Sequence, residues 1–472
     1  MSWLRRRIDR WLCMRRDREQ QTPLHRAAAA GDRDQVEALL AVCPEAATAR
    51  DARDRLPLHL ACQSGSPAVV QLLLAAAPGT AAAVATDGET PLHLACDPPD
   101  SLASPEIVQL LLARAPATAA AATATGMTPL HCACQQNPPS INVMQLLLAA
   151  APDTASAITT SGMTPLHCVC EQHPPSVEAV RLLLAAAPGT AAVAAHSRQT
   201  PLHLVINQIT PCGEVVQLLL AAAPQTAAAL GTLGDTPVHT ACRWLWSHRA
   251  EEAMMMLQAM PAAALVRNEE GQLPLHLACQ HKRFELVPPL LEAAPEAANM
   301  YDNRGWLALH RAADEGHAAA VSQLLAAAPL TATAATRGDK PGIIPVQLAV
   351  KKQHLEIAGT LLAACPTTDA IAAVAAAGKK ALPILVGIVA AHPALTLRQW
   401  AMMPAPFPGL GRVLPAALEH SHAQAAQVVS RLPEADRQRL RTATLCLARL
   451  QRSLGIGLPK LAVDRVLGAC LG

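Results

Sequence analysis

The chain has 472 residues and a formal net charge of +2, with 51% apolar residues but only 2% aromatic ones. The apolar excess is largely Ala and Leu, which suits thin, closely stacked helices and argues against a globular enzyme of this length. The charge is uneven: residues 1–20 carry +4 and residues 431–472 carry +5, which leaves −7 between them. A mildly acidic middle argues against a continuous nucleic-acid-binding track and favours protein partners.

Residues 1–20 are predicted to form a basic amphipathic helix that caps the following array. Contact with a membrane surface or with an acidic partner is the alternative for this segment. Its acidic residues and scarce Ser argue against a transit peptide. Its large apolar residues fall on one helical stripe, opposite the arginines: Trp3, Leu4, Ile8, Trp11 and Leu12.

A four-residue phrase, Thr-Pro-Leu-His in its commonest form, recurs ten times at intervals of 34 to 38 residues. A period in the range of about 20–50 residues indicates a solenoid, in which each repeat buries its apolar face only against its neighbours. We therefore predict a repeat array over residues 21–366. The ten copies begin at Thr22, Leu56, Thr90, Thr128, Thr164, Thr200, Thr236, Leu273, Leu307 and Ile344.

Each copy of the phrase is predicted to begin a helix. Thr is a good N-cap whose hydroxyl accepts from a first-turn N–H, and Pro suits the first helical position, where its missing N–H has no partner. Leu is expected in the core, and His is expected to hydrogen-bond the cap and the loop of an adjacent repeat. A second apolar run follows, such as 216–220, and ends at a Pro. Each repeat is thus predicted to be helix, turn, helix and extended arm.

The phrase, the Val-x-Leu-Leu-Leu run and a Gly shortly before the cap together resemble the ankyrin-repeat family. The resemblance covers about residues 20–366 and implies an all-α ankyrin-repeat solenoid of about ten helix-turn-helix repeats, with a separate C-terminal helical region. It also implies a protein-binding scaffold. The glycines that carry the resemblance are Gly88, Gly126, Gly162, Gly234, Gly271 and Gly305.

Fourteen cysteines raise the question of a metal site or a disulfide framework. Cys132/Cys134 and Cys168/Cys170 are two residues apart on a predicted helix, where side chains diverge, unlike the Cys-x-x-Cys spacing of zinc sites. We therefore expect no metal, no cofactor and reduced thiols. Six cysteines share one position, three residues after the motif His, and are interpreted as small core residues: Cys62, Cys96, Cys134, Cys170, Cys242 and Cys279.

Proline-rich turns between the two helices depart from the family pattern in repeats three to five. Pro98-Pro99 and the two later pairs occupy the same position within their repeats, so stacking of the repeats would place the pairs in one row. Stiff turns lower the entropy lost when a partner docks, whereas the alternative is a tolerated surface insertion. The candidate contact residues in this row are Pro138, Pro139, Pro174 and Pro175.

The seventh repeat replaces the usual Ala and Leu with bulky residues. Trp and Arg are enriched at binding hot spots and Met suits adaptable surfaces, while filling of a wider core is the alternative. The candidate partner-binding residues here are Arg243, Trp244, Trp246, Arg249 and Met255.

The repeated sequence pattern is no longer recognisable after residue 366. Residues 367–402 are predicted to form a degenerate repeat, 403–412 a Pro-rich linker, and 413–472 a C-terminal helical bundle. Leu445-Cys446 and Leu458-Pro459 are weakly similar to the SOCS box, in which such segments would meet elongin C and a cullin. We favour a simple cap over the last repeat and keep the ubiquitin-ligase interpretation as the alternative.

The sequence contains no Gly-rich phosphate loop, nucleophile elbow or His-Glu-x-x-His motif. We therefore interpret the chain as a non-catalytic protein–protein interaction scaffold, monomeric, binding one or more proteins and no nucleic acid. The alternative function is a substrate adaptor of a cullin-type ubiquitin ligase. With no recognisable signal peptide or membrane span and with reduced thiols, we expect a cytoplasmic location.

Overall fold

The computed structural model describes residues 13–98, 103–243, 250–337, 342–392, 395–407, 413–414 and 422–454. These residues form helices and no strand, which confirms the all-α prediction. Within the same ranges, no helix combines the length and apolar character needed to cross a bilayer. The chain divides into two compact units: unit 1 comprises 1–241 and 246–263, and unit 2 comprises 242–245 and 264–472.

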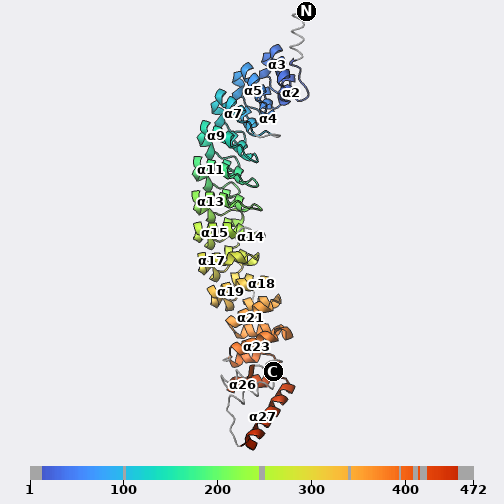
Figure 1. Ribbon diagram of the computed structural model, residues 1–472, viewed down its shortest axis with the longest axis vertical. Coiled ribbons are helices and arrows are strands. Elements are labelled where there is room, and N and C mark those ends of the chain that lie inside the picture. Colours follow the sequence, from blue (N-terminus) through green and yellow to red (C-terminus); the bar gives the residue numbers. More distant parts are fainter. Residues whose placement is uncertain are drawn as a thin grey trace, which may run out of the picture. The chain divides into compact units, whose positions relative to one another are not determined.

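Unit 1 contains the first seven described helix pairs, stacked as successive layers (Figure 1). Within this unit, successive second helices pack against each other, as α11, α13 and α15 do. The first helices are α2 (Pro23–Ala29), α4 (Pro57–Ser64), α6 (Pro91–Cys96), α8 (Pro129–Gln135), α10 (Pro165–Cys170), α12 (Pro201–Ile206) and α14 (Pro237–Arg243). The second helices are α3 (Arg33–Val42), α5 (Pro67–Ala76), α7 (Pro105–Arg114), α9 (Ile141–Ala150), α11 (Val177–Ala186), α13 (Gly213–Ala222) and α15 (Ala250–Ala259).

Unit 2 continues the pattern with three described pairs and then more helices. The pairs are α16 (Pro274–Gln280) with α17 (Val287–Ala293), α18 (Ala308–Glu315) with α19 (Ala318–Ala327), and α20 (Pro345–Lys351) with α21 (Leu355–Ala364). The remaining helices are α22 (Thr368–Ala376), α23 (Leu382–Ala391), α24 (Leu397–Met402), α26 (His422–Arg431) and α27 (Glu434–Leu454).

The segment predicted to be a Pro-rich linker is packed where it is described. Met403 and Phe407 are buried, and the Phe407 N–H donates to the Arg431 carbonyl at 2.7 Å. Burial of the large side chains of Met403 and Phe407 is favourable because it removes apolar surface from water, and the neighbouring prolines do not prevent it.

A short 3₁₀ helix follows the second helix of each of the first nine repeats, where the sequence predicts only an extended arm. In the commonest form the Thr hydroxyl donates to the carbonyl of the residue before the Pro, as Thr154 does to Ala151 at 2.6 Å. The arm becomes extended only after this turn, as at Ala157. These turns are η1 (Pro44–Thr48), η2 (Pro78–Ala82), η3 (Pro116–Ala120), η4 (Pro152–Ser156), η5 (Pro188–Ala192), η6 (Pro224–Ala228), η9 (Pro261–Leu265), η11 (Pro295–Asn299) and η12 (Pro329–Thr333).

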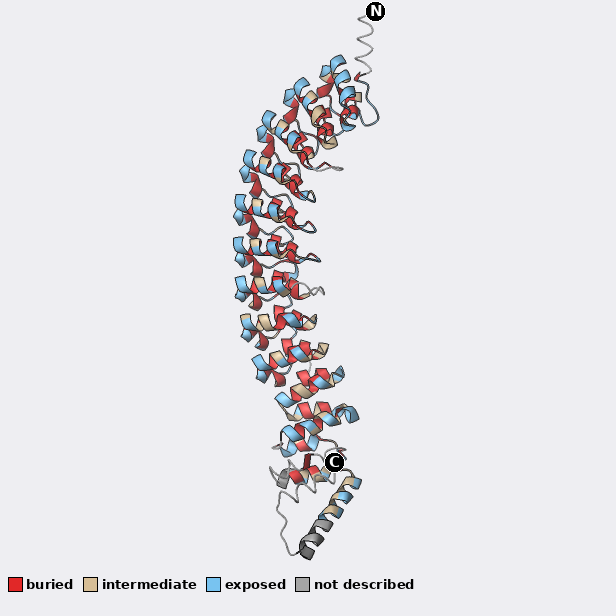
Figure 2. Ribbon diagram, viewed as in Figure 1, coloured by how far each residue is buried: buried red, intermediate tan, exposed pale blue. Residues whose placement is uncertain are grey.

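The core lies between the layers, and the outward faces of the second helices are exposed (Figure 2). In α9, Val143, Met144 and Leu147 are 0% exposed, whereas Gln145 and Ala149 on the other side are exposed. The apolar residues at helical spacing therefore form the stripe that each repeat buries against its neighbours.

The motif histidine joins two repeats. In the fourth repeat, Nδ1 of His131 accepts from the Thr128 N–H at 3.2 Å, and Nε2 lies 3.2 Å from the Met163 carbonyl of the next repeat. Because a carbonyl only accepts, Nε2 carries the proton and the Thr128 hydroxyl, 2.9 Å from Nδ1, must donate. The same pair of contacts recurs at His25, His93, His167, His203, His276 and His310.

The imidazole accepts from the N–H of the cap residue itself, whereas the Thr hydroxyl was expected to accept from an N–H of the first turn. A first-turn N–H reaches that hydroxyl at Thr236, where the His239 N–H lies 3.3 Å away. In the tenth repeat Gln347 takes over part of the role, since its Oε1 accepts from the Ile344 N–H at 3.0 Å. The predicted hydrogen bonds of His to the cap and to the adjacent loop are both present.

Burial makes these imidazoles hard to protonate. It is the largest cause that lowers the pKa of His131, His167 and His310 from 6.5 to about 4. Protonation of Nδ1 would also turn an acceptor into a donor that faces two other donors. The neutral form is thus required by the same contacts that join the repeats.

We predict that the array loses stability as the pH falls from about 6.5 towards 4. In this window the unfolded chain binds protons on the histidines and the folded chain does not, so protonation favours unfolding. A histidine with a folded pKa of about 4 should cost roughly 2 kcal/mol by pH 5. Denaturant unfolding at successive pH values measures this loss.

The control is His131→Gln, which copies Gln347 of the tenth repeat and keeps an acceptor for the cap without a titrating group. This variant should be less stable at pH 7, because the bond to Met163 is lost, but should lose less stability on acidification. An unfolding free energy that is flat between pH 7 and 5 in the parent chain would contradict the account.

Candidate partner-binding site

The cysteine positions that repeat along the array lie in the core. Cys62, Cys96, Cys134 and Cys170 are each at most 1% exposed, and burial raises the pKa of these thiols. Among the residues that the structure describes, no three His, Cys, Asp or Glu side chains are grouped to hold a metal ion. The thiols therefore act in packing, as small apolar residues do.

The proline pairs of repeats four and five are divided between surface and interior. Pro138 and Pro174 are exposed, whereas Pro139 and Pro175 are buried. Pro139 and Pro175 therefore expose little surface to a partner, and a binding role for any of the four prolines stays a prediction. Pro99 lies outside the described residues.

A row of glutamines in the same turns links successive repeats, and the sequence interpretation missed it. Gln172 is 7% exposed, and its amide donates to the carbonyl of Cys134 at 2.7 Å and to that of Gln136. Gln208 repeats the arrangement 36 residues later, donating to Cys170 and Gln172 at 2.8 and 2.7 Å. The equal spacing of Gln136, Gln172 and Gln208 is the signal that could have revealed it.

The bulky residues of the seventh repeat are only partly described. Trp244, Trp246 and Arg249 lie outside the described residues, so their role stays a prediction. Arg243 is half-buried at the end of α14. Met255 is half-buried on α15 and lines an outward-facing hollow of about 590 Å³ in unit 1.

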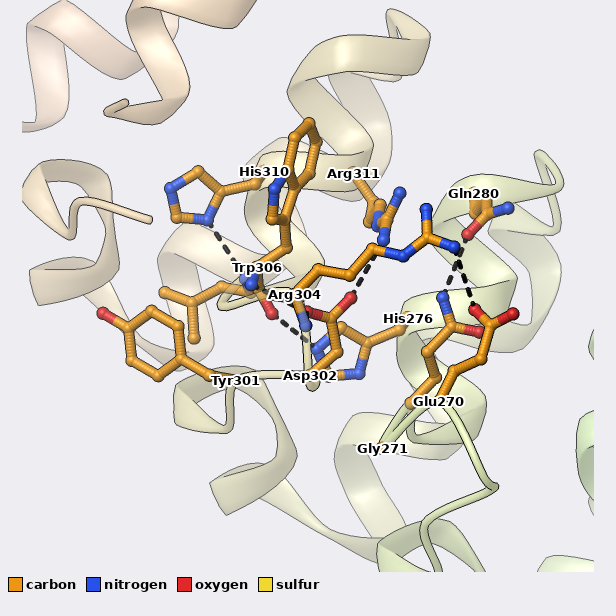
Figure 3. Close-up of polar contacts among 12 residues, drawn as sticks. Glu270, Gly271, His276, Gln280, Tyr301, Asp302, Arg304, Trp306, His310 and Arg311 are labelled. Atoms are coloured by element: carbon orange, nitrogen blue, oxygen red, sulfur yellow. Dashed lines mark hydrogen bonds and ion pairs between the residues drawn. The ribbon is translucent and has the colours of Figure 1, made fainter. Parts of the chain in front are cut away.

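Unit 2 holds a polar cluster built around a buried carboxylate (Figure 3). The Asp302 side chain is 0% exposed, and its Oδ1 accepts from the backbone N–H groups of Arg304 and Trp306 at 2.9 and 2.8 Å. Its Oδ2 pairs with Arg311 at 2.9 Å. These contacts fix the turn and hold one face of the Arg311 guanidinium over the Trp306 ring, 4.6 Å from its centroid.

A second cation–aromatic pair lies beside the first. The Arg337 guanidinium lies 3.9 Å from the centroid of Tyr301, and the Tyr301 hydroxyl donates to Ala335 at 3.4 Å. The close approach requires Gly305, whose φ is +73°, because a Cβ there would lie 1.6 Å from the Arg337 carbonyl oxygen. Arg304 forms an exposed ion pair with Glu270, in which the guanidinium nitrogen lies 3.6 Å from the carboxylate oxygen. We call Tyr301, Trp306, Arg311 and Arg337 the arginine–aromatic cluster.

This cluster was not found from the sequence, although a signal was present. Tyr301 and Trp306 are two of only nine aromatic residues in the chain, and they stand within six residues of each other. Their pairing with Arg311 and Arg337 depends on contacts within and between layers that the spacing alone does not specify.

We predict that the buried cysteines react with a thiol reagent only after unfolding. Of the twelve described cysteines, Cys212 and Cys365 are half-buried and should be modified first. Cys134→Ala and Cys170→Ala should each cost at most ~2 kcal/mol, as small core truncations. Mass spectrometry of partly labelled native protein, and metal analysis of both variants, check this. Rapid native labelling of Cys134, or one zinc equivalent lost in the double variant, would contradict it.

Gln172→Leu is predicted to destabilise the chain by roughly 1–3 kcal/mol, because two buried carbonyls lose their donor. The matched control is Gln135→Leu on the exposed end of α8, which should change stability by no more than about 0.5 kcal/mol. Urea unfolding followed by circular dichroism compares them. Equal stability of the two variants would show that the hydrogen bonds of Gln172 do not stabilise the array.

Two family models for ankyrin repeats match the chain. The model of three copies matches residues 9–82, 24–119, 58–156 and 100–194, and the model of many copies matches residues 256–312. A search of curated proteins found no match.

Among solved structures, the ankyrin repeat domain of Bcl-3, described as a unique member of the IkappaB protein family, is 28% identical. The match covers 47% of this chain and 93% of that one, with a TM-score of 0.38. The human ASB11 ankyrin repeat domain is 23% identical over 46% of this chain and 90% of that one, with a TM-score of 0.37. Because the family models match more than half of the sequence, the chain belongs to the ankyrin-repeat proteins.

Proposed function

We propose that this chain is a non-catalytic scaffold that binds one or more protein partners through side chains on the surface of its repeats. Ankyrin repeats indicate an interaction scaffold in general. The motif histidines and the repeated cysteines are engaged in capping, layer-to-layer bonds and packing, so the residues that recur most regularly support the array.

The arginine–aromatic cluster is the observation that carries the proposal. Trp, Tyr and Arg are the residues most often found at binding hot spots, where a rigid aromatic face is ringed by polar groups. Here Tyr301 and Trp306 are half-buried and thus keep part of their surface open. Asp302 holds Arg311 in place, so little side-chain entropy remains to be lost when a partner binds.

The candidates of the seventh repeat belong to the same proposal. Arg243, Trp244, Trp246, Arg249 and Met255 combine the same residue types, and Met255 lines an open hollow. The exposed prolines Pro138 and Pro174 are further proposed contacts.

The ubiquitin-ligase adaptor stays a prediction. Leu445 and Cys446 fall within α27, whose side chains are described only up to residue 444, and Leu458-Pro459 lies outside the described residues.

The scaffold proposal is tested by placing a photo-crosslinking amino acid at the exposed position Asn303, beside the cluster, in the full chain. A protein crosslinked there is then purified and its affinity measured by calorimetry. Arg337→Ala should weaken binding at least tenfold, since the residue is exposed and, among the described residues, its guanidinium stacks on the Tyr301 ring. Its unfolding midpoint should stay near that of the parent.

Arg198→Ala is the matched control, because Arg198 is an exposed arginine in the corresponding loop of unit 1. It should bind as the parent chain does. Full affinity of both Arg337→Ala and Tyr301→Ala for every crosslinked protein would contradict a binding role for the cluster.

A further inference from the structure

An exposed arginine in unit 1 binds two backbone carbonyls at once. Arg50 lies in the loop that precedes the second repeat, and its Nη1 donates to the Asp54 carbonyl at 2.9 Å and to the Val84 carbonyl at 3.0 Å. The first carbonyl is 4 residues ahead in the same loop, and the second is 34 residues ahead in the next loop. We call two carbonyls in this arrangement a carbonyl pair.

The same arrangement occurs in unit 2. Nη1 of Arg267 donates to the carbonyls of Gly271 and Tyr301 at 2.8 and 2.7 Å, which are again 4 and 34 residues ahead. A guanidinium carries several N–H donors in one plane and a carbonyl is an acceptor, so one arginine can bind both members of a pair. The chain itself therefore shows which side chain a carbonyl pair binds.

Three further carbonyl pairs in unit 1 have no arginine. At the position of Arg50, the loops before repeats three to five carry Val84, Ala122 and Ile158, whose side chains donate no hydrogen bond. The carbonyls of these pairs accept no hydrogen bond from the part of the chain that the structure describes. These arginine-free pairs are Gly88 with Ala122, Gly126 with Ile158, and Gly162 with Ala194.

The backbone of these three loops matches that of the loop that contains Arg50. In that loop, the Thr86 N–H donates to the Arg53 carbonyl at 3.0 Å, and Asp54 has a φ of +58°. In the other three loops the equivalent bond is 2.9 to 3.0 Å long and the equivalent glycine has a φ of +78° to +82°. The arginine-free pairs therefore share the backbone conformation of the pair that Arg50 fills. The equivalent bonds run from Ala124 to Asp87, from Thr160 to Thr125 and from His196 to Ser161.

The charge of this part of the chain favours a cationic partner. Residues 56–197 contain eight acidic residues and two basic ones. The basic residues, Arg114 and Arg181, lie on the second helices α7 and α11, and Arg181 pairs with Glu214. The loops that hold the arginine-free pairs thus have no arginine or lysine of their own between residues 84 and 126 or between 156 and 164.

Two carboxylates lie directly beside the first arginine-free pair. Asp87 and Glu89 flank Gly88, and neither forms an ion pair with a described residue. Burial, followed by the charge of Asp87, raises the pKa of Glu89. A guanidinium bound at Gly88 would therefore stabilise both carboxylates in their charged form.

The spacing of the pairs favours an extended partner segment. Packed helices lie about 8–10 Å apart, which sets the distance between the loops of successive layers. In a polyproline II segment every third residue lies on the same face, about 9 Å further along. Val84 and Ile158, which stand between the pairs, are 49% and 61% exposed, so proline rings of such a segment have apolar surface on which to pack.

We propose that the loops before repeats three to five bind an extended, arginine-bearing segment of a partner protein, with one guanidinium on each arginine-free carbonyl pair and apolar residues between the arginines. The proposal rests on the scaffold function and assigns a partner class to unit 1. It does not involve the arginine–aromatic cluster of unit 2, so the two can be tested separately.

The test measures binding of a synthetic peptide, Arg-Pro-Pro repeated four times, to the full chain by fluorescence anisotropy. Ala122→Arg copies Arg50 and supplies a guanidinium from the chain itself to the carbonyls of Gly126 and Ile158. This variant should bind the peptide roughly tenfold more weakly than the parent chain, since a charged hydrogen-bonding group of the peptide loses its acceptors. Val84→Arg, which fills the preceding pair, should have the same effect.

Ala124→Arg is the charge-matched control. Ala124 is exposed in the same loop, at the position that Ala52 has in the loop of Arg50, so this variant adds the same charge without a side chain at the position of Arg50. It should weaken binding by about threefold or less, because exposed charges are screened by salt. The unfolding midpoints of all three variants should stay at or above that of the parent chain.

A second peptide tests the spacing. It has the same composition, with the four arginines in one block followed by the eight prolines, and should bind the parent chain more weakly than the spaced peptide. Three results would overturn the proposal: no binding of the spaced peptide by the parent chain, equal weakening by Ala122→Arg and Ala124→Arg, or equal affinity for the two peptides.

Failure of this proposal can be told apart from failure of the scaffold function. The scaffold function would survive any of these results if a protein crosslinked at Asn303 still depends on Arg337 and Tyr301. If the crosslinking experiment fails instead, peptide binding that Ala122→Arg blocks would remain as a separate result.

Discussion

The array depends on a neutral imidazole that is bonded on both sides. In the seven repeats where both contacts are described, Nδ1 accepts from the N–H of the cap residue, and Nε2–H reaches a carbonyl of the next repeat, as His131 does to Met163. A solenoid has no global core, so neighbouring layers must be fixed one pair at a time. One buried side chain meets that need and at the same time satisfies orphan backbone groups at the helix start.

This constraint divides the chain's residues between support and recognition. Groups that recur with the period, the histidines, cysteines and buried glutamines, are buried and serve the layers. We propose that the residues that break the period are the ones that contact a partner. Tyr301 and Trp306, for example, introduce aromatic surface into a chain with very little of it.

Much of the fold could be predicted from the sequence because it is set by local chemistry. Thr-Pro-Leu-His specifies a helix start, and the bonds of its histidine follow from that position. The 3₁₀ turns were missed because a single turn of about five residues leaves no periodicity in the sequence; a Thr hydroxyl accompanies many of them, as at Thr154, but is not required. The contacts of Gln172 and the stacking of Arg337 on Tyr301 were missed because each joins residues from successive layers. The 36-residue spacing of the glutamines marks their common position in the repeat, but it does not specify the bonds between layers.

The tautomer of the motif histidines tests the central claim most directly. Long-range ¹H–¹⁵N spectra of the protein with ¹⁵N-labelled histidine distinguish Nε2–H, Nδ1–H and imidazolium forms. The account predicts that His131, His167 and His310, assigned by single substitution, stay neutral with the proton on Nε2 from pH 7 down to 5. Protons on Nδ1, or imidazolium signals for these residues at pH 6.5 in the folded protein, would contradict it.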